Sequence, residues 1–325
     1  MESTGVSRPL EGHLMHWSLV FMLVLGVVAL CAAADLPPLM TVEEALGLPR
    51  AEPDHRIDYG PEDLNFGELR LPDGPGPFPV VMVIHGGCWL AEYDLGYMSS
   101  LADRLAGEGF ATWSIEYRRV GDAGGGWPGT FVDVAAAADA LCGLAEDYPL
   151  DLDRAAVVGH SAGGHLALWL AARPGLDPDN PLRGAEPLRF RGAVALAGIT
   201  DLAAFSSSSG CGSAVPGLLG GEPAEHPERL PQTSPIAMPA SGIREVLVVG
   251  GRDPIVPISQ AELYAAARSD GAVQLVEIPS AGHFELIDPG YGSWTEILRA
   301  VQSALDISDG PRPCGGGPES SVHSD

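Results

Sequence analysis

Short apolar runs rich in β-branched residues alternate with longer segments of helical periodicity along most of this chain. Such runs are typical of strands buried on both faces of a parallel sheet, and a helix between two of them makes a βαβ unit. The expected strands are residues 80–84, 111–115, 155–158, 192–196, 245–249 and 273–278. The expected helices are residues 98–107, 130–146, 162–172, 259–269 and 293–305. The pattern predicts the α/β class, with a mostly parallel central sheet and helices on both faces.

Two segments depart from this alternation. Residues 55–59 and 66–71 are separated by a Gly-Pro turn, which predicts an antiparallel edge on the sheet. Residues 201–240 are rich in Gly, Ser and Pro, with one apolar patch, VPGLL. Connections of that length in a compact domain usually serve a function, so we expect a small cap over the functional site.

The two ends of the chain differ from its middle. Residues 17–34 form an uncharged apolar run that ends in three alanines, which is typical of a signal peptide with its cleavage site. The run is also long enough for an uncleaved anchor. We expect residues 1–34 to be a signal peptide or membrane anchor, which places the protein outside the cell or in its envelope. Residues 35–53 are the expected linker, 54–307 the folded domain, and 308–325 a disordered tail.

Charge and missing residue types exclude several classes of function. The chain contains 18 arginines and no lysine against 43 acidic residues, a net charge of -25. Such a surface repels nucleic-acid phosphates and anionic lipids, so we expect no nucleic-acid partner and no membrane substrate. The absence of lysine excludes Schiff-base chemistry. Because the cysteines and histidines lack the spacing of a metal site, we expect neither a metal nor a cofactor.

The segment from Gly159 to Gly163 reads G-H-S-A-G and fits the nucleophile elbow, G-x-S-x-G. In this motif the serine stands on a sharp turn from a strand into a helix, with its hydroxyl lifted out of the sheet. The bare motif is weak in a chain rich in Gly and Ser, but here an expected strand precedes it and an expected helix follows it. That setting makes Ser161 the candidate nucleophile.

A serine hydroxyl needs a histidine base and a carboxylate that orients the base, in the chain order serine, acid, histidine. Among the histidines after Ser161, only His283 lies in a loop just beyond an expected strand; the others are His165 on a helix, His226 in the cap and His323 in the tail. Asp253 follows the strand at 245–249 directly and is the favoured acid, with Asp288 the second choice.

Backbone amides for an oxyanion are expected where His85-Gly86-Gly87-Cys88-Trp89 follows the strand at 80–84. We assign this hole to the amides of Gly86, Gly87 and Ala162. His85 is expected to fix the loop by a hydrogen bond. For Trp89 two roles stay open, lining an acyl pocket or packing under the loop.

These motifs carry a resemblance over about residues 54–306. HGGCW, EYRR, GGGWPGTFVDV, GHSAGGHLALW, GRDPIVP and GHFELIDP are similar in kind and order to the esterase/lipase branch of the α/β-hydrolase superfamily, related to kynurenine formamidases and feruloyl-type esterases. The resemblance implies Ser161 as nucleophile, Asp253 as acid and His283 as base. Cys88 departs from the HGGG form of the motif, which argues against typical substrates of hormone-sensitive lipases.

Four cysteines follow the apolar run, namely Cys88, Cys142, Cys211 and Cys314. A chain of this size needs no disulfide framework, so we expect at most one bridge, which the sequence does not identify, and a small buried thiol at Cys142.

We expect a serine carboxylesterase that acts on a small-molecule ester, short-chain or aryl, through an acyl-enzyme. Two alternatives are an arylformamidase-like amide hydrolase and a non-catalytic, hydrolase-like binding module. The sequence leaves the oligomeric state open.

Overall fold

The structure is a computed structural model that describes Met1 and residues 36–208, 210–268 and 271–305. The chain divides into two units, Met1–Pro38 and Leu39–Asp325, and the described part of the first contains no helix or strand. The expected signal peptide or anchor, apart from Met1, and the expected tail at 308–325 lie outside the described residues. No helix in the described part is both long and apolar enough to cross a bilayer.

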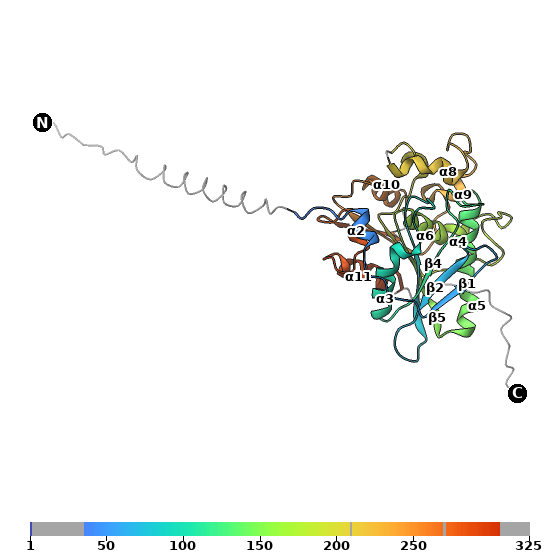
Figure 1. The fold of residues 1–325 in the computed structure, drawn as a ribbon. Helices are drawn as coiled ribbons and strands as arrows, with labels where there is room; N and C mark the ends of the chain where they lie inside the picture. Colours follow the sequence, from blue (N-terminus) through green and yellow to red (C-terminus); the bar gives the residue numbers. More distant parts are fainter. Residues whose placement is uncertain (2–35, 209, 269–270, 306–325) are drawn as a thin grey trace. The chain divides into compact units, whose positions relative to one another are not determined.

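The second unit is built on one eight-stranded sheet of order β1-β2-β4-β3-β5-β6-β7-β8 (Figure 1). The strands are β1 His55–Asp58, β2 Phe66–Arg70, β3 Phe78–Ile84, β4 Ala111–Ile115, β5 Leu150–His160, β6 Gly192–Leu196, β7 Arg244–Gly250 and β8 Val273–Ile278. β1 and β2 pair antiparallel, as do β2 and β4, while all other neighbours are parallel. The predicted α/β class with an antiparallel edge is confirmed.

Successive residues of the central strand β3 point into two different hydrophobic cores. Val80, Met82 and Ile84 belong to one core, whereas Val81 and Val83 belong to the other. Because side chains alternate across a strand, an apolar run with no polar position needs cover on both faces of the sheet. The run in β3 has that cover.

Helices on each face supply the two cores (Figure 1). α3 Ser99–Gly107 and α11 Trp294–Leu305 pack on one face, while α4 Gly129–Asp139, α5 Leu141–Asp147, α6 Ala162–Ala172 and α10 Ser259–Ala267 pack on the other. The predicted helix at 130–146 is two helices, α4 and α5, that meet at Ala140. β5 begins earlier than predicted, because the charged residues Asp151, Asp153 and Arg154 interrupt the apolar pattern without ending the strand.

The segment 201–240 forms a series of short helices. They are α7 Leu202–Phe205, η3 Gly210–Ala214, α8 Val215–Leu219, α9 Leu230–Thr233 and η4 Pro235–Ala237. Val215, Leu218 and Leu219 of the VPGLL patch are fully buried and belong to the same core as α4 and α6. The patch therefore anchors the cap to the body of the domain.

A short helix lies within the segment that we expected to be a plain linker. It is α2 Val42–Leu46, which begins with a capping box between Thr41 and Glu44. Ala45 is buried in the core shared with α3 and α11, and the amide of Met40 donates to the Glu285 carboxylate at 2.7 Å. From Leu39 onward this segment is part of the second unit.

Candidate active site

Ser161 stands between β5 and α6 with a strained backbone, φ 55° and ψ -120°. A residue with a side chain rarely adopts a positive φ, and such strain is typical of a nucleophile elbow. The flanking glycines make the turn possible: a Cβ on Gly159 would lie 2.0 Å from the carbonyl oxygen of Gly163, and one on Gly163 would lie 2.2 Å from that of Ile84. Only glycine fits at either position.

Asp253 and His283 are brought together by the neighbouring strands β7 and β8. The Nδ1 atom of His283 lies 2.6 Å from Oδ2 of Asp253, and both side chains are 3% exposed. The other carboxylate oxygen, Oδ1, accepts the amide N–H groups of Ile255 and Val256 at 2.7 and 3.0 Å. Asp288 is engaged elsewhere, since its Oδ1 accepts the amide of Gly290.

His160 connects the elbow to the histidine loop, a role that sequence reasoning missed. Its Nε2 donates to the carbonyl oxygen of His283 at 3.0 Å, and the two rings have centroids 4.4 Å apart. The hydroxyl of Tyr97 donates to Nδ1 of His160 at 2.6 Å, and burial lowers the pKa of His160 well below its ordinary value, so the ring is neutral. Among the described residues, no hydrogen bond joins Ser161 to the His283 ring.

The loop after β3 lies against the elbow because β3 and β5 are paired neighbours. A Cβ on Gly86 would approach the Cβ of Ser161 to 3.2 Å, and one on Gly87 would approach the Cβ of Tyr93 to 2.4 Å. Among the described residues, the amide N–H groups of Gly86, Gly87 and Ala162 have no hydrogen-bond acceptor. All three amides of the predicted oxyanion hole are therefore free to donate to another acceptor.

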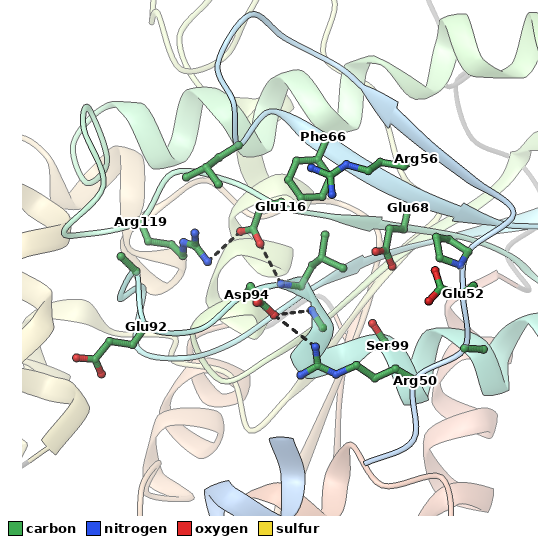
Figure 2. A pocket seen from close by; sticks show the side chains of 16 residues that line it. Arg50, Glu52, Arg56, Phe66, Glu68, Glu92, Asp94, Ser99, Glu116 and Arg119 are labelled. Carbon is green, nitrogen blue, oxygen red and sulfur yellow. Dashed lines mark hydrogen bonds and ion pairs between the residues drawn. The ribbon is translucent and has the colours of Figure 1, made fainter. Parts of the chain in front are cut away.

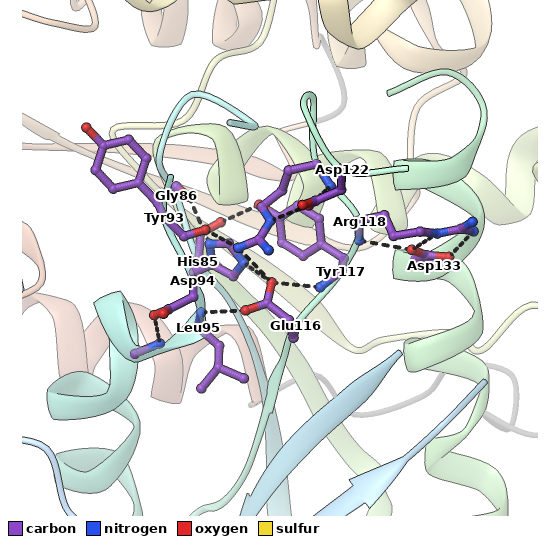
Figure 3. A network of polar contacts seen from close by, with 12 residues as sticks. His85, Gly86, Tyr93, Asp94, Leu95, Glu116, Tyr117, Arg118, Asp122 and Asp133 are labelled. Carbon is purple, nitrogen blue, oxygen red and sulfur yellow. Dashed lines mark hydrogen bonds and ion pairs between the residues drawn. The ribbon is translucent and has the colours of Figure 1, made fainter. Parts of the chain in front are cut away.

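A buried carboxylate, Glu116, holds this loop from behind (Figure 3). Its Oε1 lies 3.1 Å from Nε2 of His85 and 3.1 Å from the Arg119 guanidinium, while Oε2 accepts the amide of Leu95 at 3.0 Å. Burial alone would raise the pKa of Glu116, but the neighbouring His85 and Arg119 lower it below its ordinary value. His85 therefore fixes the loop through Glu116, a residue that the sequence pattern did not single out.

Trp89 packs under the loop and is fully buried. Its Nε1 donates to Nδ1 of His165 at 3.2 Å, and Nε2 of His165 donates to the carbonyl oxygen of Thr233 at 2.8 Å. Of the two roles that the sequence left open for Trp89, the packing role is the one observed. The chain of bonds links the loop after β3 through α6 to the cap.

We expect His165 to make the folded state less stable as the pH falls. Burial lowers the pKa of His165 from 6.5 to about 4, although its bond to Thr233 opposes the shift. Between pH 6.5 and about 4, His165 takes up a proton in the unfolded chain but stays neutral in the folded one. The free energy of unfolding therefore keeps its full value above pH 6.5 and declines as the pH falls toward 4. Urea unfolding at pH 7.5 and 5.0 should show a decline about 2 kcal/mol smaller in His165→Gln than in the wild-type protein. Equal declines would contradict the assignment.

A separate cleft of about 440 Å³ lies beside the loop after β3 (Figure 2). Its wall includes Glu116 and Arg119, together with Arg50, Arg56 and Asp94. None of the three candidate catalytic residues lines it. The cleft therefore borders the network of Glu116 and lies apart from Ser161.

The cysteines in the described residues differ from two of our expectations. Cys88 and Cys211 form a disulfide, with Cα atoms 5.2 Å apart. Cys142 is disulfide-bonded as well, so the expectations of a buried free thiol there and of at most one bridge are wrong. Cys142 lies on α5 and is half-buried. Cys314 lies outside the described residues.

Known proteins resemble this chain in sequence. The family model described as BD-FAE matches residues 69–267, more than half of the chain. Esterase LipC of Mycobacterium tuberculosis is 30% identical over 254 residues, 72% of this chain and 60% of LipC. Esterase LipQ of the same organism is 29% identical over 260 residues, 73% of this chain and 60% of LipQ. The chain thus spans about 60% of the length of these curated relatives.

Solved structures share the fold. Esterase B from Lactobacillus rhamnosis aligns with a TM-score of 0.66 at 20% identity, covering 89% of this chain and 96% of that structure. The thermophilic esterase Est2 from Thermogutta terrifontis aligns with a TM-score of 0.62 at 20% identity, covering 80% and 95%. Together with the sheet order, this likeness establishes the α/β-hydrolase fold, and the family match establishes that the chain belongs to the BD-FAE family.

Proposed function

We propose that the protein is a serine carboxylesterase, with Ser161 as nucleophile, His283 as general base and Asp253 as the carboxylate that orients His283. The observation that carries the proposal is the 2.6 Å contact between His283 and Asp253. The loop of His283 is bonded to His160, the residue that directly precedes the strained Ser161. The named esterases among the relatives support the reaction class.

In the proposed reaction, His283 takes the proton of Ser161 as Oγ attacks the ester carbonyl. Asp253 keeps the imidazole in the tautomer that has its free nitrogen toward the serine. The oxyanion would accept hydrogen bonds from the amides of Ala162 and of Gly86 or Gly87. His283 then protonates the leaving alcohol, and water releases the acid from Ser161 by the same steps.

The proposed substrates are soluble esters with short acyl or aryl groups. Val215, Leu218 and Leu219 of the VPGLL patch are buried in the core of the domain, so they are not free to line a long acyl tunnel or to form an interfacial lid. The net charge of -25 also disfavours adsorption to anionic lipid.

A panel of substrates tests the reaction and the pocket together. In a p-nitrophenyl ester series, kcat/KM should rise from acetate to about butyrate, because each methylene that fits contributes about 0.8 kcal/mol, and then fall. An N-formyl aniline and a peptide, measured beside the esters, should react far more slowly. An optimum at long chains, with a rate jump at an oil interface, would refute the short pocket, and preference for the formamide would favour the amide-hydrolase alternative.

We also propose that the protein works in an oxidising compartment, outside the cell or in its envelope. Disulfides persist in such compartments and are rare where thiols are kept reduced. The bridge between Cys88 and Cys211 supports this location.

A further inference from the structure

The loop after β3 passes through three successive residues with positive φ: Gly87 at 99°, Cys88 at 54° and Trp89 at 57°. Glycine adopts this region freely, but the Cβ of any other residue makes it unfavourable. At Cys88 and Trp89 the surrounding structure must therefore hold the backbone in place.

Trp89 is held by ordinary packing and hydrogen bonds. Its side chain is fully buried and bonded to His165, and its carbonyl oxygen accepts the amide of Val120 at 2.8 Å. Cys88 differs, because its side chain is only half-buried. This side chain is held covalently by its disulfide to Cys211, 123 residues further along the chain.

Cys211 lies in η3, in a part of the cap that is itself firmly anchored. Phe205 precedes it and Val215 follows it, and both are buried in the core that contains α4 and α6. Gly212 sits so close to the carbonyl oxygen of Phe205 that a Cβ would lie 2.4 Å from it. The disulfide therefore ties Cys88 to a well-packed support.

We propose that the disulfide between Cys88 and Cys211 is a positioning element for the oxyanion amides: it keeps residue 88 in the left-handed conformation that directs the preceding amides toward Ser161. The inference rests on the proposed function, because these amides matter for turnover only if an oxyanion forms there. Without the bridge, residue 88 can relax to a negative φ and turn the peptide bonds of Gly86 and Gly87 away.

This role predicts that glycine at residue 88 makes the bridge dispensable for activity. Two double variants that lack the bridge between Cys88 and Cys211 test this prediction. They are Cys88→Ala/Cys211→Ser and Cys88→Gly/Cys211→Ser, which differ by a single methyl group. The alanine variant should lose about tenfold in kcat with KM changed less than about twofold, because the oxyanion exists only in the transition state. The glycine variant should come within about threefold of wild-type kcat, since glycine accepts a positive φ without strain.

Thermal unfolding separates positioning from stability. Both variants lose the same covalent link, so both should melt at a lower temperature than wild-type protein. Activity is then measured below both transitions, on p-nitrophenyl acetate, with phosphonate labelling at Ser161 as a second readout of the oxyanion site. The glycine variant should recover kcat and labelling rate without recovering the melting temperature.

The outcomes distinguish this inference from the proposed function. If wild-type protein is labelled at Ser161 but the two variants are equally slow, or both are as active as wild type, the bridge has no positioning role and the inference is overturned. If wild-type protein takes no label at Ser161, the proposed function fails and the inference fails with it.

Discussion

Ser161→Ala and His283→Ala should each lower kcat for a short-chain ester by about 10⁴-fold or more, and Asp253→Asn by about 10³- to 10⁴-fold. The first removes the nucleophile and the second removes the base. In Asp253→Asn an amide replaces the carboxylate that bonds to Nδ1 of His283. The His283 ring then loses the tautomer that the reaction needs and the negative charge beside it. Steady-state kinetics on p-nitrophenyl butyrate measures all three effects.

Because the three residues act on one step, Ser161→Ala/His283→Ala should be little slower than either single variant. An organophosphonate should label the wild-type protein at Ser161 and leave Ser161→Ala unlabelled, as peptide mapping would show.

The matched control for the acid is Asp288→Asn, since Asp288 lies in the same connection between β8 and α11 as His283 but bonds to the amide of Gly290. It should keep wild-type activity. Loss of activity in Asp288→Asn, with activity retained in Asp253→Asn, would show that the acid has been assigned to the wrong residue.

Glu116→Gln should lower kcat by about 10²-fold and destabilise the fold by about 3 kcal/mol, the loss typical when one partner of a buried ion pair is removed. The carboxylate of Glu116 accepts hydrogen bonds from His85 and the amide of Leu95 and forms an ion pair with Arg119. The glutamine NH₂ group would oppose one or more of these donors and leave the Arg119 charge without its buried partner. His85 and the loop that follows it would then lose their support.

The readouts for Glu116→Gln are the urea midpoint and kcat, with KM as a third quantity. KM should change little, because Glu116 acts through the position of the loop and touches no substrate in the proposed reaction.

Asp122→Asn is the matched control for Glu116→Gln. Asp122 also binds the Arg119 guanidinium, at 3.0 Å, but is more exposed and makes no bond to His85. It should stay within about 1 kcal/mol and about twofold of the wild-type values. Full activity of Glu116→Gln in its folded state would overturn the positioning role of Glu116.

The amino-acid sequence was sufficient for the strand and helix order, because the physical causes of that order are local. A strand buried on both faces, such as β3 or β6, must be an unbroken apolar run. The position of Ser161 was equally readable, since the elbow requires glycines at fixed offsets between a strand and a helix. The pairing of Asp253 with His283 could be inferred because each follows the end of a parallel strand, and such ends meet at one edge.

The tertiary structure alone decided what supports the candidate site. Glu116 bonds to a histidine 31 residues away, Tyr97 reaches His160 across 63 residues, and Cys88 pairs with Cys211 across 123. None of these partners shares a helix or strand with the other, so no periodicity or motif connects them. Such contacts depend on how the strand order places distant loops side by side, which is a property of the packed sheet and not of any stretch of sequence.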